Sequence, residues 1–201
     1  FNIIPDSFFF TLLCAIISLT GVAIRAMTVG YLPRKTEDEV TSGVKSTELI
    51  TQGMYSIVRH PIALGNLLAW YGIILYVGVS WFIIGAILLY TLFTYQILLC
   101  EEEELAKRFG DRYSLWASYT NALIPNRKLW IRSRDKFSLM QVLRREYIGF
   151  FFLVLTFVTI NLLRNRVIEF TWSLSPLWTV VGGATLLFTI FIRLIIKLIN
   201  K

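Results

Sequence analysis

The sequence predicts an all-α, polytopic integral membrane protein, and three observations support this fold class. Hydrophobic residues make up 56% of the 201 residues and charged residues only 16%, against about 25% in ordinary soluble domains. The mean hydropathy is +0.63. Long apolar segments recur along the chain, and a spanning helix needs roughly 20 mostly apolar residues. These features leave too little polar sequence to cover a soluble domain and exclude that class.

The apolar segments define about five transmembrane helices. They cover residues 7–29, 61–79, 81–100, 147–163 and 176–196. Only a short stretch separates the second segment from the third, so these two should form a tight antiparallel helical hairpin. The sequence shows no internal repeat or low-complexity linker. We therefore expect one domain over residues 1–201, with a core motif region at 25–126 and a two-helix extension at 127–201.

The distribution of basic residues orients these helices. The net charge is +7, from 20 Lys and Arg against 13 Asp and Glu. The basic residues flank the apolar segments, which favours membrane lipid head groups over nucleic acid as partners. Residues 31–59 hold four of them and residues 101–146 hold ten, whereas Arg164 and Arg166 remain on the opposite side. The positive-inside rule puts both long polar segments on the cytoplasmic face.

Cysteine and histidine usage argues against a metal centre. The two cysteines, Cys14 and Cys100, both lie in apolar runs, and the chain has a single histidine. Neither a zinc ligand set nor a disulfide framework can be assembled from these residues. We predict no metal.

The first candidate motif ends in Arg59-His60-Pro61. Proline suits the first turn of a helix, where its missing N–H costs nothing. Arg59 and His60 then lie at the N-terminus of that helix, where an anion meets the positive end of the helix dipole. The alternative is that the pair only anchors the helix at the membrane interface, and the spacing alone leaves both interpretations open.

The second candidate motif is the acidic run from Glu101 to Glu104. In a helix, Glu103 faces Lys107 and Glu104 faces Arg108 at i,i+4 spacing, which explains these two acids as surface ion pairs. Glu101 and Glu102 have no such partner. They precede an apolar stripe that we expect Leu105, Phe109 and Tyr113 to form on one helix. Carboxylates on this side of a membrane helix are costly unless a cation meets them.

Arg25, near the inner end of the first apolar segment, is the third candidate. Its default explanation is that the side chain reaches along the helix to the cytoplasmic surface. The alternative is that it holds an anionic substrate. Trp130 and the basic residues around it predict an interfacial belt that contacts lipid phosphates.

These motifs together resemble a known family. The pattern Gly-x-Tyr-x-x-Val-Arg-His-Pro, an apolar hairpin, then Glu-Glu-x-x-Leu-x-x-x-Phe-Gly-x-x-Tyr is similar to isoprenylcysteine carboxyl methyltransferases. That broad family includes phospholipid methyltransferases. The stretch before the motif, Arg25-Ala-Met-Thr-Val-Gly-Tyr-Leu-Pro, resembles a bacterial subgroup associated with methylation of the lipid A 1-phosphate. The resemblance implies a bacterial inner-membrane protein.

The resemblance also implies a cofactor and site residues. The cofactor is S-adenosylmethionine, bound in a pocket on the cytoplasmic face. The positions that match the family's cofactor side are His60, Gly65, Glu101, Glu102, Tyr55 and Tyr113. We expect Arg59, with Arg25, to orient an anionic lipid acceptor. Two departures are Ala63, where the family usually has Tyr, and Trp116, where a second Tyr is common.

Several functions remain compatible with the sequence. The acceptor could be a lipid phosphate, which we favour, a prenylated cysteine carboxylate or a phospholipid amine. A sulfonium methyl group is electrophilic enough to be attacked by an anionic oxygen without a strong base, so positioning and water exclusion would be the main tasks of the protein. Two alternatives are not methyltransferases. One is a nicotinamide-dependent membrane reductase, and the other is a non-enzymatic membrane scaffold or transporter subunit.

Overall fold

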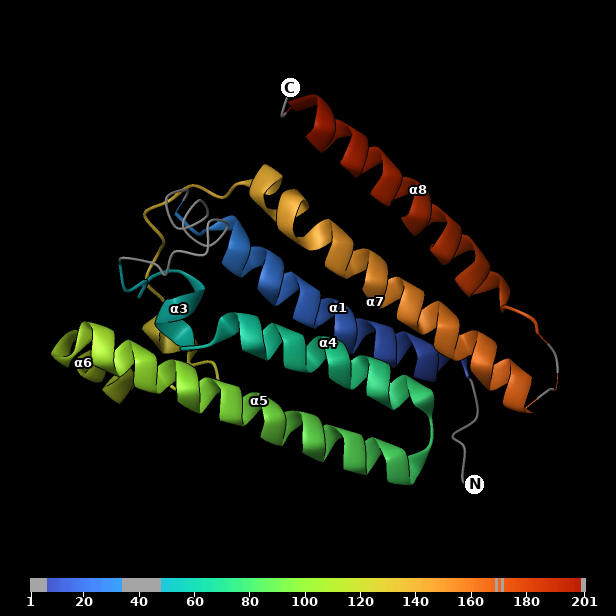
Figure 1. The fold of residues 1–201 in the computed structure, drawn as a ribbon, viewed down its shortest axis with the longest axis horizontal. Helices are drawn as coiled ribbons and strands as arrows, with labels where there is room; N and C mark the ends of the chain where they lie inside the picture. The colour runs from blue at the N-terminus through green and yellow to red at the C-terminus, as the bar shows by residue number, and fades with distance from the viewer. Residues whose placement is uncertain (1–6, 34–47, 169, 171, 200–201) are drawn as a thin grey trace.

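The structure, a computed structural model, describes residues 7–33, 48–168, 170 and 172–199. Its regular elements within these residues are helices. In chain order they are α1 (Phe8–Gly30), α3 (Met54–Ile57), α4 (Pro61–Val77), α5 (Ser80–Phe109), α6 (Asp111–Tyr119), the short 3-10 helix η1 (Arg127–Leu129), α7 (Leu139–Ile168) and α8 (Pro176–Ile199). The five long helices run along a common direction, and α3, α6 and η1 cluster at one end (Figure 1).

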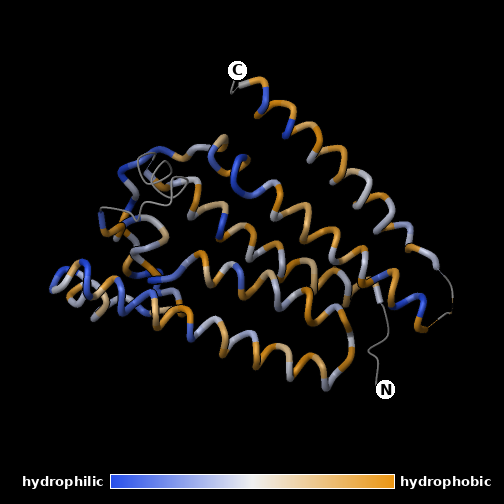
Figure 2. The backbone as a smooth tube through the Cα atoms, viewed as in Figure 1, coloured by the Kyte–Doolittle hydropathy of each residue, from blue (hydrophilic) through white to orange (hydrophobic). Residues whose placement is uncertain are grey.

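Four of these helices, α1, α5, α7 and α8, are long and apolar enough to cross a membrane. The helix α4 is apolar but has only 17 residues. Apolar positions dominate the long helices, and hydrophilic positions gather near α6 (Figure 2). The all-helical, polytopic membrane fold predicted from composition is therefore confirmed, with four long spans and one shorter apolar helix.

The predicted hairpin is present, formed by α4 and α5. Helix α4 ends at Val77, Gly78 adopts a left-handed conformation with φ 78°, and α5 begins at Ser80. Helix α5 then continues to Phe109, nine residues beyond the apolar segment predicted to end at 100. The acidic run therefore lies on the same rigid helix as the apolar span.

Helices α1 and α4 form the most extensive interface, because small residues let their backbones approach closely. A Cβ atom on Gly72 would lie 2.1 Å from Ser18 Oγ and 2.4 Å from Cys14 O, so no larger residue fits there. The hydroxyl of Ser18 donates a 2.8 Å hydrogen bond to the carbonyl of Ala69. Interfaces of this kind are typical of helices packed in membranes.

Helix α7 packs against α1, α4 and α8, whereas α5 packs against α4 and α6. The apolar segment predicted at 147–163 is thus part of a longer helix that begins eight residues earlier. Its first turns contain the buried polar residues Gln141 and Glu146. Both face α1, where they have hydrogen-bond partners, and this explains why polar residues are tolerated in a packed helix.

One prediction about the acidic helix is wrong. Leu105, Phe109 and Tyr113 do not form one apolar stripe, because α5 ends at Phe109 and Gly110 takes a φ of 54°, which favours glycine. Tyr113 belongs instead to α6, which packs back against α5. This turn places α6 beside the acidic pair.

Candidate functional site

The two candidate motifs meet at one end of the molecule. Glu102 Oε1 lies 3.0 Å from Arg59 Nε and 3.0 Å from His60 Nε2. His60 Nδ1 lies 3.5 Å from Glu101 Oε2. A carboxylate can only accept, so the short contact indicates that Nε2 carries the ring hydrogen. Arg59 is thus the cation that Glu102 was expected to need, and the acidic pair also contacts the ring of His60.

Backbone hydrogen bonds hold Arg59 and His60 in position. The amide of Arg59 donates to the carbonyl of Asn121 at 2.8 Å, and that of His60 donates to Ala122 at 3.1 Å. Pro61 begins α4, as predicted, with His60 as the preceding cap residue. The orientation of both side chains is therefore set by the segment after α6 as well as by α4.

Arg59 is engaged on several sides. Its Nη1 atom donates to the carbonyls of Ala117 and Thr120 at 2.7 and 2.8 Å, while Nε and Nη2 contact Glu102. A guanidinium group has five N–H donors in a fixed planar array. Most of these donors contact α5 or the α6 region, so Arg59 connects both of them to the segment before α4.

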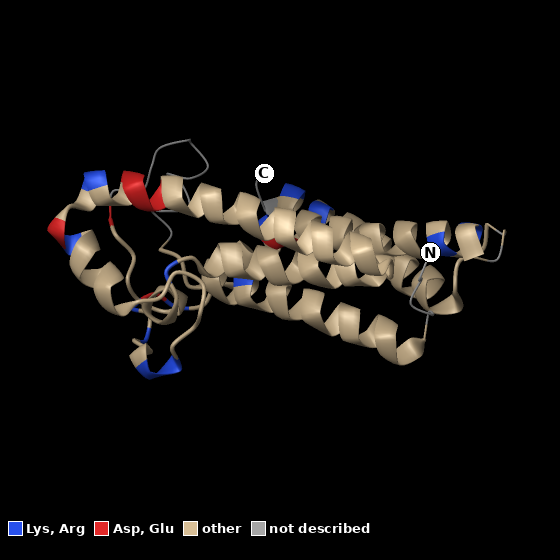
Figure 3. Ribbon diagram, turned by 90° about the horizontal axis from the view of Figure 1, so that it is seen from below, with Lys and Arg blue, Asp and Glu red and all other residues tan. Residues whose placement is uncertain are grey.

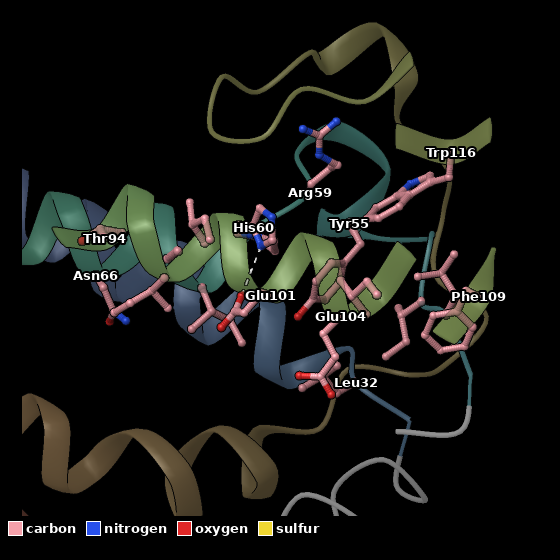
Figure 4. A pocket seen from close by; sticks show the side chains of 18 of the residues that line it. Leu32, Tyr55, Arg59, His60, Asn66, Thr94, Glu101, Glu104, Phe109 and Trp116 are labelled. Carbon is pink, nitrogen blue, oxygen red and sulfur yellow. Dashed lines mark ion pairs between the residues drawn. The ribbon is translucent and has the colours of Figure 1, made fainter. Parts of the chain in front are cut away.

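A pocket of about 620 Å³ opens beside this cluster (Figure 4). This volume is in the usual range for small-molecule and cofactor sites. Its polar and charged lining residues are Glu48, Tyr55, Arg59, His60, Asn66, Tyr90, Thr94, Glu101, Glu104, Arg108, Trp116 and Arg145. Apolar residues of α4 and α5 complete the wall, among them Ala63, the site of the departure from the family pattern.

The pocket extends along α5 from the acidic run toward the apolar span. Its lining residues on α5 begin at Tyr90 and end at Phe109, a distance of about 28 Å along a helix that rises 1.5 Å per residue. At the inner end, Phe93 and Ile97 line the pocket and are also exposed on the helix surface. The same cavity therefore contacts charged groups at one end and lipid-facing surface at the other.

Two tyrosines beside the pocket have perturbed acidity. Burial raises the pKa of Tyr55 to about 12; the negative charge of Glu101 adds to this effect and Arg145 opposes it. Burial also raises the pKa of Tyr113, with a further contribution from Glu102 and opposition from Arg59. Both phenols remain protonated at neutral pH and are available as hydrogen-bond donors.

Three buried polar atoms near the pocket have no hydrogen-bond partner among the described residues. They are the hydroxyls of Tyr113 and Thr120 and the indole Nε1 of Trp116. An unpaired buried donor costs about 1–3 kcal/mol, so such groups call for an explanation. Trp116 also lines the pocket. Unused donors beside a cavity are consistent with a site that a polar ligand completes.

Arg25 lies apart from this cluster, within the helix bundle. It forms a bidentate pair with Glu146 of α7, with Nε to Oε2 and Nη2 to Oε1 both at 2.9 Å, and it also donates to Asn66. Gly65 faces α1 as well, because an added Cβ would lie 2.6 Å from Arg25 Cγ. Gly65 is absent from the described pocket lining, and its cofactor contact stays a prediction.

Sequence reasoning found Arg59, His60, Tyr55 and Glu101, which all line the pocket. It missed the contribution of α7, namely Arg145 in the lining and Glu146 as the partner of Arg25. A signal was present, because Glu146 lies four residues after Val142 and directly precedes the apolar segment at 147–163. An acid on the apolar side of a helix next to a membrane span requires a partner.

The fold and this geometry define a class: an integral membrane protein with a charged pocket at one end of its helices. The family model described as phospholipid methyltransferase matches residues 9–112, just over half of the chain. The chain belongs to the phospholipid methyltransferase family. No curated protein and no solved structure matches it. The matched range includes α1, α3, α4 and α5 but ends before α7.

Proposed function

We propose that this protein is an S-adenosylmethionine-dependent methyltransferase that acts on a lipid acceptor within the membrane. The observation that carries the proposal is the pocket, which joins the Glu101–His60 end to the lipid-facing residues Phe93 and Ile97 in one cavity. A polar methyl donor and the head group of a lipid can meet there. Family membership supports the same reaction class.

The residues at the polar end fit the proposed cofactor. Trp116 Nε1 and the Tyr113 hydroxyl are donors without partners among the described residues, and Glu101 is a half-exposed carboxylate that can accept hydrogen bonds from hydroxyl groups. His60 and Tyr55 also line this end of the pocket, whereas Glu102 and Tyr113 are absent from the described lining. When bound, S-adenosylmethionine supplies an electrophilic methyl group that an anionic oxygen accepts directly as the carbon–sulfur bond breaks.

The acceptor that we favour is an anionic lipid phosphate, of the kind found on lipid A. A phosphate oxygen is already anionic and needs no general base to attack the methyl group. The protein's part is then to position the acceptor and to exclude water, which can lower a barrier by several kcal/mol. The resemblance to the bacterial subgroup favours a bacterial inner membrane. The described basic residues of 101–146 gather mainly at the pocket end (Figure 3), which favours a pocket that faces the cytoplasm.

The roles of the two predicted acceptor-binding arginines are refined by their contacts. The guanidinium groups of Arg59 and Arg25 are each held by a carboxylate. We propose that both are positioning residues: Arg59 holds Glu102 and α6 at the cofactor end, and Arg25 holds α7 against α1. Contact of either one with the acceptor stays a prediction.

The first experiment is calorimetric binding of S-adenosylmethionine to the detergent-purified protein. We expect micromolar binding by the wild type and a loss of at least about 100-fold in Glu102→Ala, because Arg59 and His60 lose the carboxylate that they share. Glu103→Ala is the matched control, since Glu103 is exposed and pairs with Lys107 at 2.6 Å in an i,i+4 contact on the same helix.

Thermal unfolding of each variant separates loss of binding from loss of the fold, and Glu102→Gln provides a milder change at the same position. Absence of binding by folded wild-type protein would contradict the proposal. Transfer of labelled methyl groups to phosphate, carboxylate and amine lipids then identifies the acceptor. An amine acceptor would show a steep rise in rate as pH passes the amine pKa, and that result would exclude the phosphate.

A further inference from the structure

Helix α7 contributes to the pocket although it lies outside the residues that match the family. The matched range is 9–112, whereas Arg145 of α7 lines the pocket together with residues of α4 and α5. Arg145 is half-buried, and its charge is close enough to Tyr55 to oppose the rise in the pKa of that phenol. The pocket wall is therefore completed by a part of the chain that family membership does not explain.

The start of α7 is held firmly against α1. Glu146 makes the bidentate pair with Arg25, and the side chain of Gln141 donates to the carbonyl of Leu32 at 3.2 Å. The amide of Ser138 donates to the carbonyl of Gly30 at 2.9 Å. These contacts surround Arg145 on both sides in sequence, so a rigid element presents its side chain at the pocket.

The other arginines near the pocket are placed for different tasks. Arg59 is tied to Glu102 and to two carbonyls of the α6 region, and Arg25 is tied to Glu146. Arg108 is exposed near the end of α5, with its guanidinium 5.6 Å from the centre of the Phe109 ring. Arg145 differs from these three in lying on α7, where it is half-buried in the pocket wall.

The position of Arg145 along its helix matches the level of lipid phosphates. It lies two residues before the apolar segment at 147–163, which is where basic residues meet the head groups of a membrane. Its neighbour Glu146 connects through Arg25 to Asn66, which also lines the pocket. Phe93, which is exposed on the surface of α5 and available to a lipid tail, lines the same pocket as Arg145.

We propose that Arg145 binds the phosphate group of the lipid acceptor and thereby determines which lipid is methylated. This inference rests on the proposed methyltransferase function. A guanidinium group presents paired N–H donors that match two phosphate oxygens, which gives both affinity and orientation. Lysine carries the same charge without that planar geometry, so it should replace Arg145 only in part.

The test compares Arg145→Ala and Arg145→Lys with the control Arg144→Ala, an exposed neighbour that does not line the described pocket. Initial rates are measured in mixed micelles with phosphatidic acid, a lipid phosphomonoester, and with the zwitterionic phosphatidylethanolamine. We expect Arg145→Ala to raise KM for phosphatidic acid by at least about tenfold, as for loss of a charge-assisted hydrogen bond. kcat and S-adenosylmethionine affinity should change much less, Arg145→Lys should be intermediate, and Arg144→Ala should match the wild type.

A second readout does not depend on turnover: native mass spectrometry of phosphatidic acid retained by the wild type and by Arg145→Ala. Lower retention in the variant supports the assignment. Equal retention and equal KM in the two proteins would overturn it, and so would a parallel loss of cofactor affinity, which would assign Arg145 to the cofactor end. Failure of the wild type to bind S-adenosylmethionine would instead refute the proposed function, and the retention experiment would still decide the role of Arg145.

Discussion

Both ends of the helix bundle contain a cluster of polar and aromatic side chains, but the two clusters differ in how their tyrosine and tryptophan side chains are hydrogen-bonded. At the opposite end, the buried hydroxyl of Tyr76 accepts hydrogen bonds from Asn161 Nδ2 at 3.1 Å and from Trp178 Nε1 at 2.8 Å. The ring of Phe157 stacks on Trp178 with centroids 5.2 Å apart. At the pocket end, the equally buried hydroxyl of Tyr113 has no partner among the described residues.

The difference shows how similar residues serve stability at one end and ligand binding at the other. The Tyr76 cluster joins α4, α7 and α8, and the guanidinium of Arg164 donates to the carbonyl of Tyr76 at 2.6 Å. These hydrogen bonds satisfy buried groups and hold three helices together. The pocket end is less stabilised in the absence of a ligand, because its unpaired donors form hydrogen bonds only when a ligand is bound.

The largest effect on stability is expected from Tyr76→Phe. The substitution leaves the donors of Asn161 and Trp178 buried without their shared acceptor, which costs about 1–3 kcal/mol in the free energy of unfolding. Methyl transfer at a temperature well below unfolding should be unchanged. Thermal and chemical unfolding in detergent measure the loss. The control is Tyr95→Phe, at a position 51% exposed, and an equal effect of the two substitutions would contradict the proposed role.

Tyr113→Phe is expected to change the free energy of unfolding less than Tyr76→Phe does, and to lower ligand affinity instead. The substitution removes a buried hydroxyl that has no partner among the described residues, so the free energy of unfolding should not fall and should rise by up to about 1 kcal/mol. Affinity for S-adenosylmethionine should fall about 3- to 10-fold if the hydroxyl contacts the ligand. Calorimetry and unfolding on the same preparation separate the two quantities. Unchanged affinity would remove Tyr113 from the cofactor site.

The smallest effect is expected from Tyr55, whose ionisation matters only in strong alkali. Its pKa is about 12 in the folded protein, against an ordinary value of 10.0. Below pH 10 the phenol is protonated in both states, so its contribution to stability is fully present. Between pH 10 and 12 only the unfolded state loses the proton, and that contribution is lost as pH rises. Across this pH range, the free energy of unfolding should fall less steeply for Tyr55→Phe than for the wild type. Identical slopes in the two proteins would contradict the raised pKa of Tyr55.

Much of the fold and part of the site were predictable because they depend on local sequence. Apolar length defined the long helices, Pro61 marked the start of α4, and the short link after Val77 indicated the hairpin. The acidic pair was expected to need a cationic partner, and Arg59 provides it for Glu102. In each case the cost of an unsatisfied group or an exposed apolar segment is evident from the residue itself.

The sequence alone determined that this is a helical membrane protein of the phospholipid methyltransferase family, with two charged motifs at the same end. Only the tertiary structure decided which groups are paired and which face the pocket. Gly110 turns α6 back on α5, and Glu146 reaches Arg25 across 121 positions of sequence. The physical reason is that hydropathy and helical period act over neighbouring residues, whereas an ion pair depends on how distant helices pack.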